Sequence, residues 1–134
     1  MSGIRAVPDE ISIIIKDLSN HDWNIRQAAV RRVGGIGNPE DLSMLFQRLT
    51  REKWYIREAA SAGIRVLAVP SLVPVLQSMM RDGDDILRNA AACALGNIRS
   101  PEAEEILEHA AHDPDCRVRK NAQVSLQRLR GPRY

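Results

Sequence analysis

A pair of histidines is the part of this sequence that comes nearest to a metal site. His109 and His112 lie three residues apart with Asp113 beside them, so a helix would place both imidazoles on one face as half of a metal site. Such a pair at a helix surface is more often simply solvated. We therefore expect no metal and no cofactor.

Two cysteines and a glycine run are the other candidates for chemistry. Cys93 and Cys116 lack the spacing of a metal-binding motif; we favour reduced thiols, with a disulfide between them as the open alternative. Cys116 is expected in the exposed first turn of a helix, a position where a thiol is reactive in some proteins. The run GGIG at residues 34–37 is expected to end a helix and form a turn, not to cradle a phosphate.

No catalytic motif is found in the sequence. It contains no nucleophile elbow, no His-Glu-x-x-His motif, no phosphate-binding loop and no cysteine–histidine pair at a recognisable spacing. We therefore expect a protein that is not an enzyme, has no catalytic residues and takes no small-molecule substrate.

The composition is typical of a soluble helical domain. Of 134 residues, 44% are hydrophobic, 27% are charged and only 4% are aromatic, and the abundant alanine, leucine and arginine favour helices over strands. The net charge of +2 is too small to imply a nucleic-acid or membrane partner. The apolar run ISIII is too short to span a membrane, and the N-terminus lacks a signal-peptide pattern. We expect a cytoplasmic protein.

The elements that would carry these residues follow a 31-residue repeat. Arginines and prolines each recur four times at this spacing: Arg26, Arg57, Arg88 and Arg119, and Pro39, Pro70, Pro101 and Pro132. Apolar or small residues lie one position before each arginine and three, seven and ten positions after it, which is the stripe of one helix. Each proline is expected to begin a second helix, because its fixed φ and missing N–H cost least there. The second helices are expected to bury residues three, six and ten positions after the proline, which include Met80.

Aspartates precede three of the four arginines by four residues. Asp22, Asp84 and Asp115 are expected to cap the N-terminus of the arginine-containing helix, and to contact its arginine one turn later. Lys53 occupies this position in the second repeat. That helix is therefore expected to be poorly capped, or to be capped by Glu52.

The repeat predicts an all-α fold, an α-α superhelix (solenoid) of about four 31-residue helix-pair repeats with eight helices. A single domain is expected over residues 1–134. Its parts are a capping helix at 8–19, helix pairs at 22–50, 53–80 and 84–111, a last helix at 115–130 and a tail at 131–134.

The pattern D-x-x-[IV]-R-x-x-A … LG-x-I … P resembles the short HEAT-like repeats of the phycobilisome-lyase type. It extends over residues 8–130 and is closest in the segment DILRNAAACALGNI. The resemblance implies a curved stack, in which the residue before each arginine enters the core and the arginine ties turns or adjacent repeats together. Some HEAT-like proteins are iron hydroxylases that use His-Glu pairs; this sequence has no His-Glu dipeptide, so that activity is not supported.

The resemblance also implies which positions line the concave face of the stack. They lie three and two residues before each arginine and one, two and five residues after it. The candidate partner-binding residues at these positions are Trp23, Asn24, Gln27, Arg31, Trp54, Tyr55, Glu58, Asp85, Asn89, Arg117 and Lys120. Because tryptophan and tyrosine often dominate binding energy, the three aromatic residues suggest a docking patch. The alternative is that each tryptophan packs over the loop of the preceding repeat.

Charge is segregated near the C-terminus. Residues 100–115 carry six acidic residues and no Lys or Arg, whereas residues 116–134 carry six basic residues and no acid. The basic segment could attract an acidic partner or phosphate groups, or could simply be the polar end of the stack.

Three functions are considered as hypotheses. The favoured one is a non-catalytic scaffold or adaptor that binds a protein or peptide on the concave face. A bilin-lyase-like or phycobilisome-associated accessory subunit rests on the resemblance alone. Nucleic-acid binding would use the basic C-terminal repeat, with Trp54 and Tyr55 stacking on bases.

Overall fold

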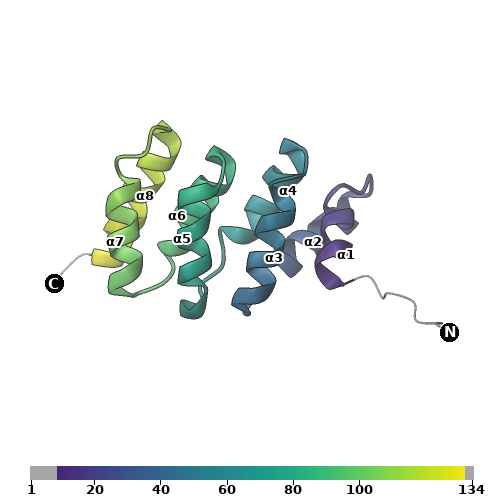
Figure 1. The fold of residues 1–134 in the computed structure, drawn as a ribbon, viewed down its shortest axis with the longest axis horizontal. Helices are drawn as coiled ribbons and strands as arrows, with labels where there is room; N and C mark the ends of the chain where they lie inside the picture. Colours follow the sequence, from purple (N-terminus) through teal and green to yellow (C-terminus); the bar gives the residue numbers. More distant parts are fainter. Residues whose placement is uncertain (1–8, 132–134) are drawn as a thin grey trace.

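The computed structural model describes residues 9–131, and in this range it contains eight α-helices, one 3₁₀ turn and no strand (Figure 1). The all-α prediction with eight helices is confirmed. The elements are α1 (Glu10–Leu18), α2 (Trp23–Gly34), α3 (Pro39–Leu49), α4 (Trp54–Ile64), η1 (Pro70–Leu72), α5 (Val73–Asp82), α6 (Asp85–Leu95), α7 (Pro101–Ala110) and α8 (Cys116–Arg130).

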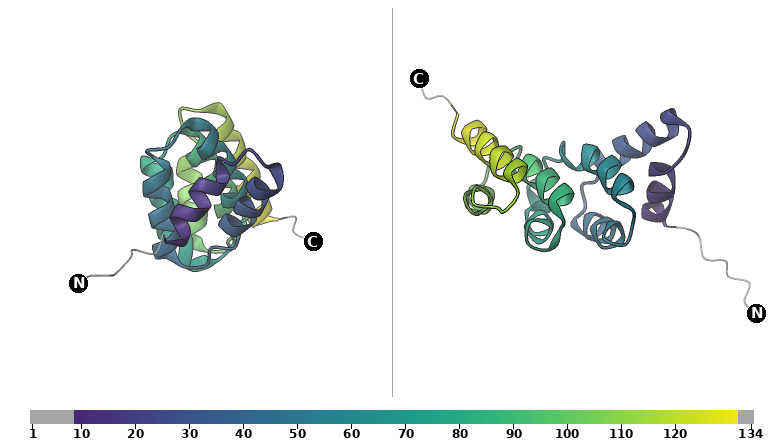
Figure 2. Two further views of the ribbon diagram at one scale, coloured as in Figure 1. Left: turned by 90° about the vertical axis from the view of Figure 1, so that its right-hand side faces the viewer. Right: turned by 90° about the horizontal axis from the view of Figure 1, so that it is seen from above.

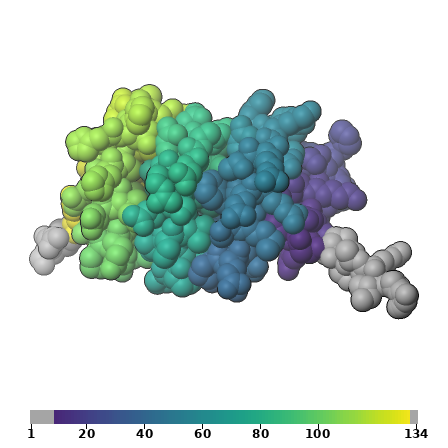
Figure 3. Space-filling model, viewed as in Figure 1, coloured from purple at the N-terminus to yellow at the C-terminus, as the bar shows by residue number. Residues whose placement is uncertain are grey.

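The helices form two layers that follow one another along the long axis of the molecule. Helices α2, α4, α6 and α8, which carry the repeated arginines, lie side by side and contact one another; we call them the arginine layer (Figure 2). Helices α1, α3, α5 and α7 form the outer layer. The right-hand view of Figure 2 shows a gentle curve with the arginine layer on its inner side. The space-filling view shows the repeats in sequence order along the molecule (Figure 3).

The core lies between the two layers and continues from repeat to repeat. The predicted stripe of the arginine layer is buried at Ala29, Val33, Ile36, Ile56, Ala60, Ile64, Leu67, Leu87, Ala91, Leu95, Ile98, Val118, Ala122 and Leu126, and Leu129 is partly buried. Ile25 is an exception, since 38% of its surface is exposed and the prediction that it enters the core is wrong. The equivalent residues of later repeats have a preceding arginine-layer helix beside them, whereas within the described residues α2 has none.

The prolines begin the outer helices in two of three described cases. Pro39 and Pro101 are the first residues of α3 and α7, behind caps supplied by Asn38 and Ser100. Pro70 instead opens the 3₁₀ turn η1, and α5 follows three residues later. Pro8, the expected start of the capping helix, and Pro132, in the expected tail, lie outside the described residues.

The 3₁₀ turn also changes which methionine of α5 is buried. Met79 is fully buried, whereas the predicted Met80 is only partly buried. A 3₁₀ turn completes a rotation in about 3.0 residues and an α-helix in about 3.6, so the buried side is reached one residue earlier than an uninterrupted helix would place it.

The helix caps of the arginine layer follow the sequence pattern. The carboxylates of Asp22, Asp84 and Asp115 accept backbone N–H bonds at the starts of α2, α6 and α8. Lys53, at the start of α4, provides no side-chain cap, as predicted, and Glu52 does not replace it. Among residues 9–131, none of the capping aspartates pairs with the repeated arginine four residues later, so that part of the prediction is wrong.

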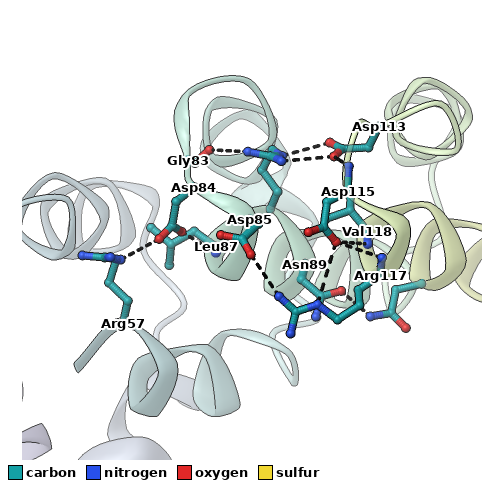
Figure 4. Close-up of polar contacts among 12 residues, drawn as sticks. Arg57, Gly83, Asp84, Asp85, Leu87, Asn89, Asp113, Asp115, Arg117 and Val118 are labelled. Carbon is teal, nitrogen blue, oxygen red and sulfur yellow. Dashed lines mark hydrogen bonds and ion pairs between the residues drawn. The ribbon is translucent and has the colours of Figure 1, made fainter. Parts of the chain in front are cut away.

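Each repeated arginine instead binds the loop before its helix. Arg26 donates to the backbone carbonyls of Asn20 and His21, and Arg57 donates to that of Glu52. Arg88 donates to the carbonyl of Gly83, and Arg119 donates to those of Asp113 and Pro114. Two of them also reach the next repeat, where Arg57 pairs with Asp84 at 2.7 Å and Arg88 pairs with Asp113 at 2.9 Å (Figure 4). The prediction that these arginines tie turns and adjacent repeats together is confirmed.

Capping by Asp115 makes the last repeat sensitive to acid. Its Oδ1 accepts the N–H groups of Val118 and Arg117, and these bonds hold the pKa of the carboxyl below its ordinary value of 3.8. Because the folded-state pKa is lowered, the stabilisation is complete above the ordinary pKa and is lost as pH falls through the folded pKa.

We therefore expect Asp115→Asn, which keeps a capping side chain but does not titrate, to reduce the loss of stability below about pH 4. Urea unfolding followed by circular dichroism at a series of pH values between about 3 and 6 measures the slope of the free energy of unfolding against pH. Asp41→Asn removes an exposed carboxylate of α3 and serves as the control. An unchanged slope for Asp115→Asn, relative to the unmodified chain, would contradict the assignment.

Candidate functional site

Three aromatic side chains are exposed at the starts of two neighbouring helices of the arginine layer. Trp23 and Trp54 are the first residues of α2 and α4, and 62% and 63% of their surfaces are exposed. Tyr55 is 47% exposed, and its ring meets the Trp54 ring edge to face, with centroids 5.9 Å apart. Side chains this exposed are not covering the core of a neighbouring repeat.

The interface between α2 and α4 has the same register as the interface between α6 and α8. A Cβ added to Gly34 would meet Gly63 and Val66 of the next helix, and one added to Gly96 would meet Ser125 and Arg128. These are equivalent positions in the 31-residue repeat. Residues at equivalent repeat positions therefore correspond to one another at the two interfaces.

The three aromatic residues lie near the starts of two adjacent helices. Asp85 and Arg117, which lie three and two residues before their arginines, form an ion pair at 2.9 Å across α6 and α8 (Figure 4). Trp23 and Tyr55 occupy the same two positions on α2 and α4, which also pack side by side. Trp23, Tyr55 and Trp54 are here called the aromatic strip, and within it the Trp54 and Tyr55 rings are in contact.

The other candidate residues differ in how accessible they are. Asn24, Arg31, Glu58 and Lys120 are exposed on the arginine layer, whereas Gln27 and Asp85 are half-buried. Val124, at the position equivalent to Arg31 in the fourth repeat, is also exposed. Val124 lies five residues after Arg119, and this offset alone could have identified it as a candidate from the sequence.

Asn89 is not available to a partner, in contrast to the expectation from its position. Only 6% of its surface is exposed, and its Oδ1 accepts a hydrogen bond from the amide of Asn121 (Figure 4). Asn121 of the next helix, α8, lies against Asn89 and covers it.

Two of the basic residues of the C-terminal repeat are paired with acids in three dimensions. Arg130 of α8 lies 2.7 Å from Glu108 and 3.7 Å from Glu104, both on α7. Arg117 pairs with Asp85, and Arg119 donates to loop carbonyls. The folded chain therefore does not present these cations as a continuous basic patch.

The residues singled out for chemistry do not assemble into a reactive centre. The described residues contain no group of three or more side chains placed to hold a metal ion, and His109 and His112 are exposed. Both cysteines are free; burial raises the pKa of the Cys93 thiol, and Cys116 is the exposed first residue of α8. Gly34 and Gly35 end α2, as predicted for the glycine run.

A shallow groove between α5 and α7 was not anticipated from the sequence. Met80, Ile106 and Ala110 form its apolar wall, with Arg81 and His109 at its edge. It belongs to the outer layer, and none of the candidate partner-binding residues lines it. No helix among residues 9–131 is long and apolar enough to cross a membrane.

Comparison with known proteins identifies a family. The family description HEAT repeats fits residues 5–65 and 42–127, which together span most of the chain. This description is the general one and does not distinguish the phycobilisome-lyase type that the repeat motif resembles. No curated protein matches the sequence. HEAT repeats generally mediate contacts between proteins.

Proposed function

The chain belongs to the HEAT-repeat family, and we propose that it is a non-catalytic scaffold that binds a protein partner on its arginine layer, chiefly through the aromatic strip. The observation that carries this proposal is the exposure of Trp23, Trp54 and Tyr55 on adjacent helices of the inner, concave side. Tryptophan and tyrosine are the residues most enriched among those that dominate protein–protein binding energy.

The remaining surface supports the same proposal. Aromatic side chains that stay exposed in the free protein forgo the stabilisation that burial would give them. Exposed clusters of this kind are typical of interaction sites. Helices α2 and α4 pack closely where Gly63 meets Val30 and Val33, so the two helices that carry the strip are held together before a partner binds. Arg31 and Glu58, exposed on the same two helices, supply polar groups of opposite sign.

The alternative functions have less support. Nucleic-acid binding needs several free cations beside the stacking rings, but Arg117 and Arg130 are engaged in ion pairs with acidic side chains. A phycobilisome-associated role rests on the motif resemblance alone. The expectation of a cytoplasmic location stays a prediction.

The proposal is tested by capturing partners from a native lysate with the tagged chain. We expect Trp54→Ala/Tyr55→Ala to lose at least about tenfold of the captured partner, because hot-spot aromatics each contribute about 2 kcal/mol or more. The control is Ile13→Ala/Met44→Ala, which removes two exposed apolar side chains from the outer layer. Unfolding curves should be nearly unchanged for both. Equal capture by both variants would contradict the proposal, and a large stability loss in the first would indicate a packing role for the aromatic pair.

A further inference from the structure

We propose that the aromatic strip recognises an arginine side chain of the partner, held between the rings of Trp54 and Tyr55 and the carboxylate of Glu58. This inference rests on the proposed function and names the chemistry of the partner at its central contact. It commits to a basic, arginine-containing segment, because Glu58 is the one acid within α4, is exposed and takes part in no ion pair among residues 9–131.

The three side chains share one side of α4. At about 100° per residue, Glu58 projects about 40° from Trp54 and about 60° from Tyr55, on opposite sides. All three are exposed, and residues three and four apart on a helix are neighbours. Of the cations near Glu58 in sequence, Arg57 is paired with Asp84, and Lys53 lies before the first residue of the helix and forms no ion pair with Glu58 among residues 9–131.

Glu58 lacks the partner that its equivalent in the next repeat has. One repeat later the same position is Asn89, whose oxygen accepts a hydrogen bond from Asn121 of α8. The residue of α6 equivalent to Asn121 is Ala90, which has no donor to offer. Glu58 also takes part in no ion pair among residues 9–131. Its carboxylate therefore remains open to a donor from outside.

The neighbouring interface shows how the same surface is completed by an arginine of the chain itself. Asp85, three residues before Arg88, is paired with Arg117 of the next helix. Trp54 stands at the position of Asp85, and Ile86 stands at the position of Arg117. Between the second and third repeats, Trp54 and Ile86 therefore occupy the positions that the Asp85–Arg117 ion pair occupies between the third and fourth repeats.

An arginine fits this site better than a lysine. A guanidinium is planar, stacks on an aromatic face and offers a fork of donors to a carboxylate, whereas an ammonium is a strongly hydrated point charge. Trp54 and Tyr55 lie with their ring planes 87° apart. A guanidinium that stacks on one ring can therefore meet the edge of the other while it donates to Glu58.

The test uses a fluorescein-labelled Gly-Arg-Gly-Arg-Gly peptide and the intact chain, with binding followed by fluorescence anisotropy. The indole N–H signals of the two tryptophans, resolved by nuclear magnetic resonance, locate the contact. We expect saturable binding that shifts the Trp54 signal and weakens with added salt. The lysine peptide should bind more weakly, and the peptide with citrulline in place of arginine should not bind measurably.

Two variants separate the contribution of the Glu58 charge to peptide binding from that of the aromatic rings. Glu58→Gln should raise the Kd about two- to fivefold, the range of an exposed ion pair, and Trp54→Ala/Tyr55→Ala should abolish saturable binding. Glu40→Gln, an exposed acid on α3, should leave the Kd unchanged. Equal binding of the citrulline peptide, an unchanged Kd for Glu58→Gln, or preference for a glutamate peptide would each overturn the inference.

The same variants distinguish this inference from the proposed function. If the lysate partner is lost with Trp54→Ala/Tyr55→Ala but retained fully with Glu58→Gln, the strip is the docking surface and the arginine assignment is wrong. If capture is unaffected by the aromatic double variant, the proposed function itself is wrong.

Discussion

Gly63→Ala is expected to lower the free energy of unfolding by about 2 kcal/mol, one of the largest effects of any single methyl group added to this chain. Gly63 lies within α4 where that helix crosses α2. A Cβ built at this position would stand 2.5 Å from the carbonyl oxygen of Val30 and 2.7 Å from the Cβ of Val33. The first contact is with backbone and the second with a β-branched side chain that has little rotamer freedom. The two helices must therefore move apart.

The expected loss is a balance of two effects. Alanine is favoured over glycine inside a helix by about 1 kcal/mol, which offsets part of the clash. Overpacking typically costs about 1–3 kcal/mol, and a clash with backbone belongs at or above the upper end because no rotamer relieves it. We therefore expect the clash to exceed the gain in helix propensity.

Urea unfolding followed by circular dichroism measures the Gly63→Ala effect. Gly37→Ala is the matched control, because a Cβ there would meet no heavy atom within 4 Å, and its stability should be unchanged or slightly higher. A Gly63→Ala chain as stable as the control would mean that α2 and α4 are not packed as closely as described.

Asp113→Ala is expected to destabilise the chain by about 1.5–3 kcal/mol, through loss of the link between the third and fourth repeats. Only 8% of the Asp113 side chain is exposed, and its two oxygens accept from Nε and Nη2 of Arg88 at 2.9 and 3.1 Å. Its Oδ1 also accepts the backbone N–H of Asp115. The hydrogen bond to Asp113 is the main reason that the pKa of Arg88 is raised.

Removal of Asp113 leaves the half-buried guanidinium of Arg88 without its anionic partner. Chemical unfolding of Asp113→Ala, Arg88→Met and the double variant forms a cycle that isolates the pair, and we expect a coupling clearly above the few tenths of a kcal/mol found between distant sites. Asp82→Ala is the control. Asp82 pairs with Arg81 at 3.4 Å with both side chains largely exposed, so its loss should cost less than about 0.5 kcal/mol. Equal losses for Asp113→Ala and Asp82→Ala would refute the structural role of the buried pair.

The sequence by itself determined the features of this protein that depend on short stretches of chain. The 31-residue period, the buried stripe of each arginine-layer helix, the aspartate caps and the missing cap at Lys53 were all predictable. Helical periodicity, capping and proline geometry involve residues within one or two turns of each other, and they act the same way in any context. The exposed position of Trp54 and Tyr55 belongs to this class, since it follows from where they lie on the helix.

Only the tertiary structure decided which side chains meet across repeats. Asp84 and Asp113 are the partners of arginines more than 20 residues away, Asn89 is covered by α8, and Arg117 and Arg130 of α8 are paired with acids. These outcomes depend on the rotation and shift between stacked repeats, which a sequence period does not encode. The packing of α2 against α4 also sets Trp23 on the helix next to Trp54 and Tyr55, so the candidate binding site is a product of stacking and not of any single helix.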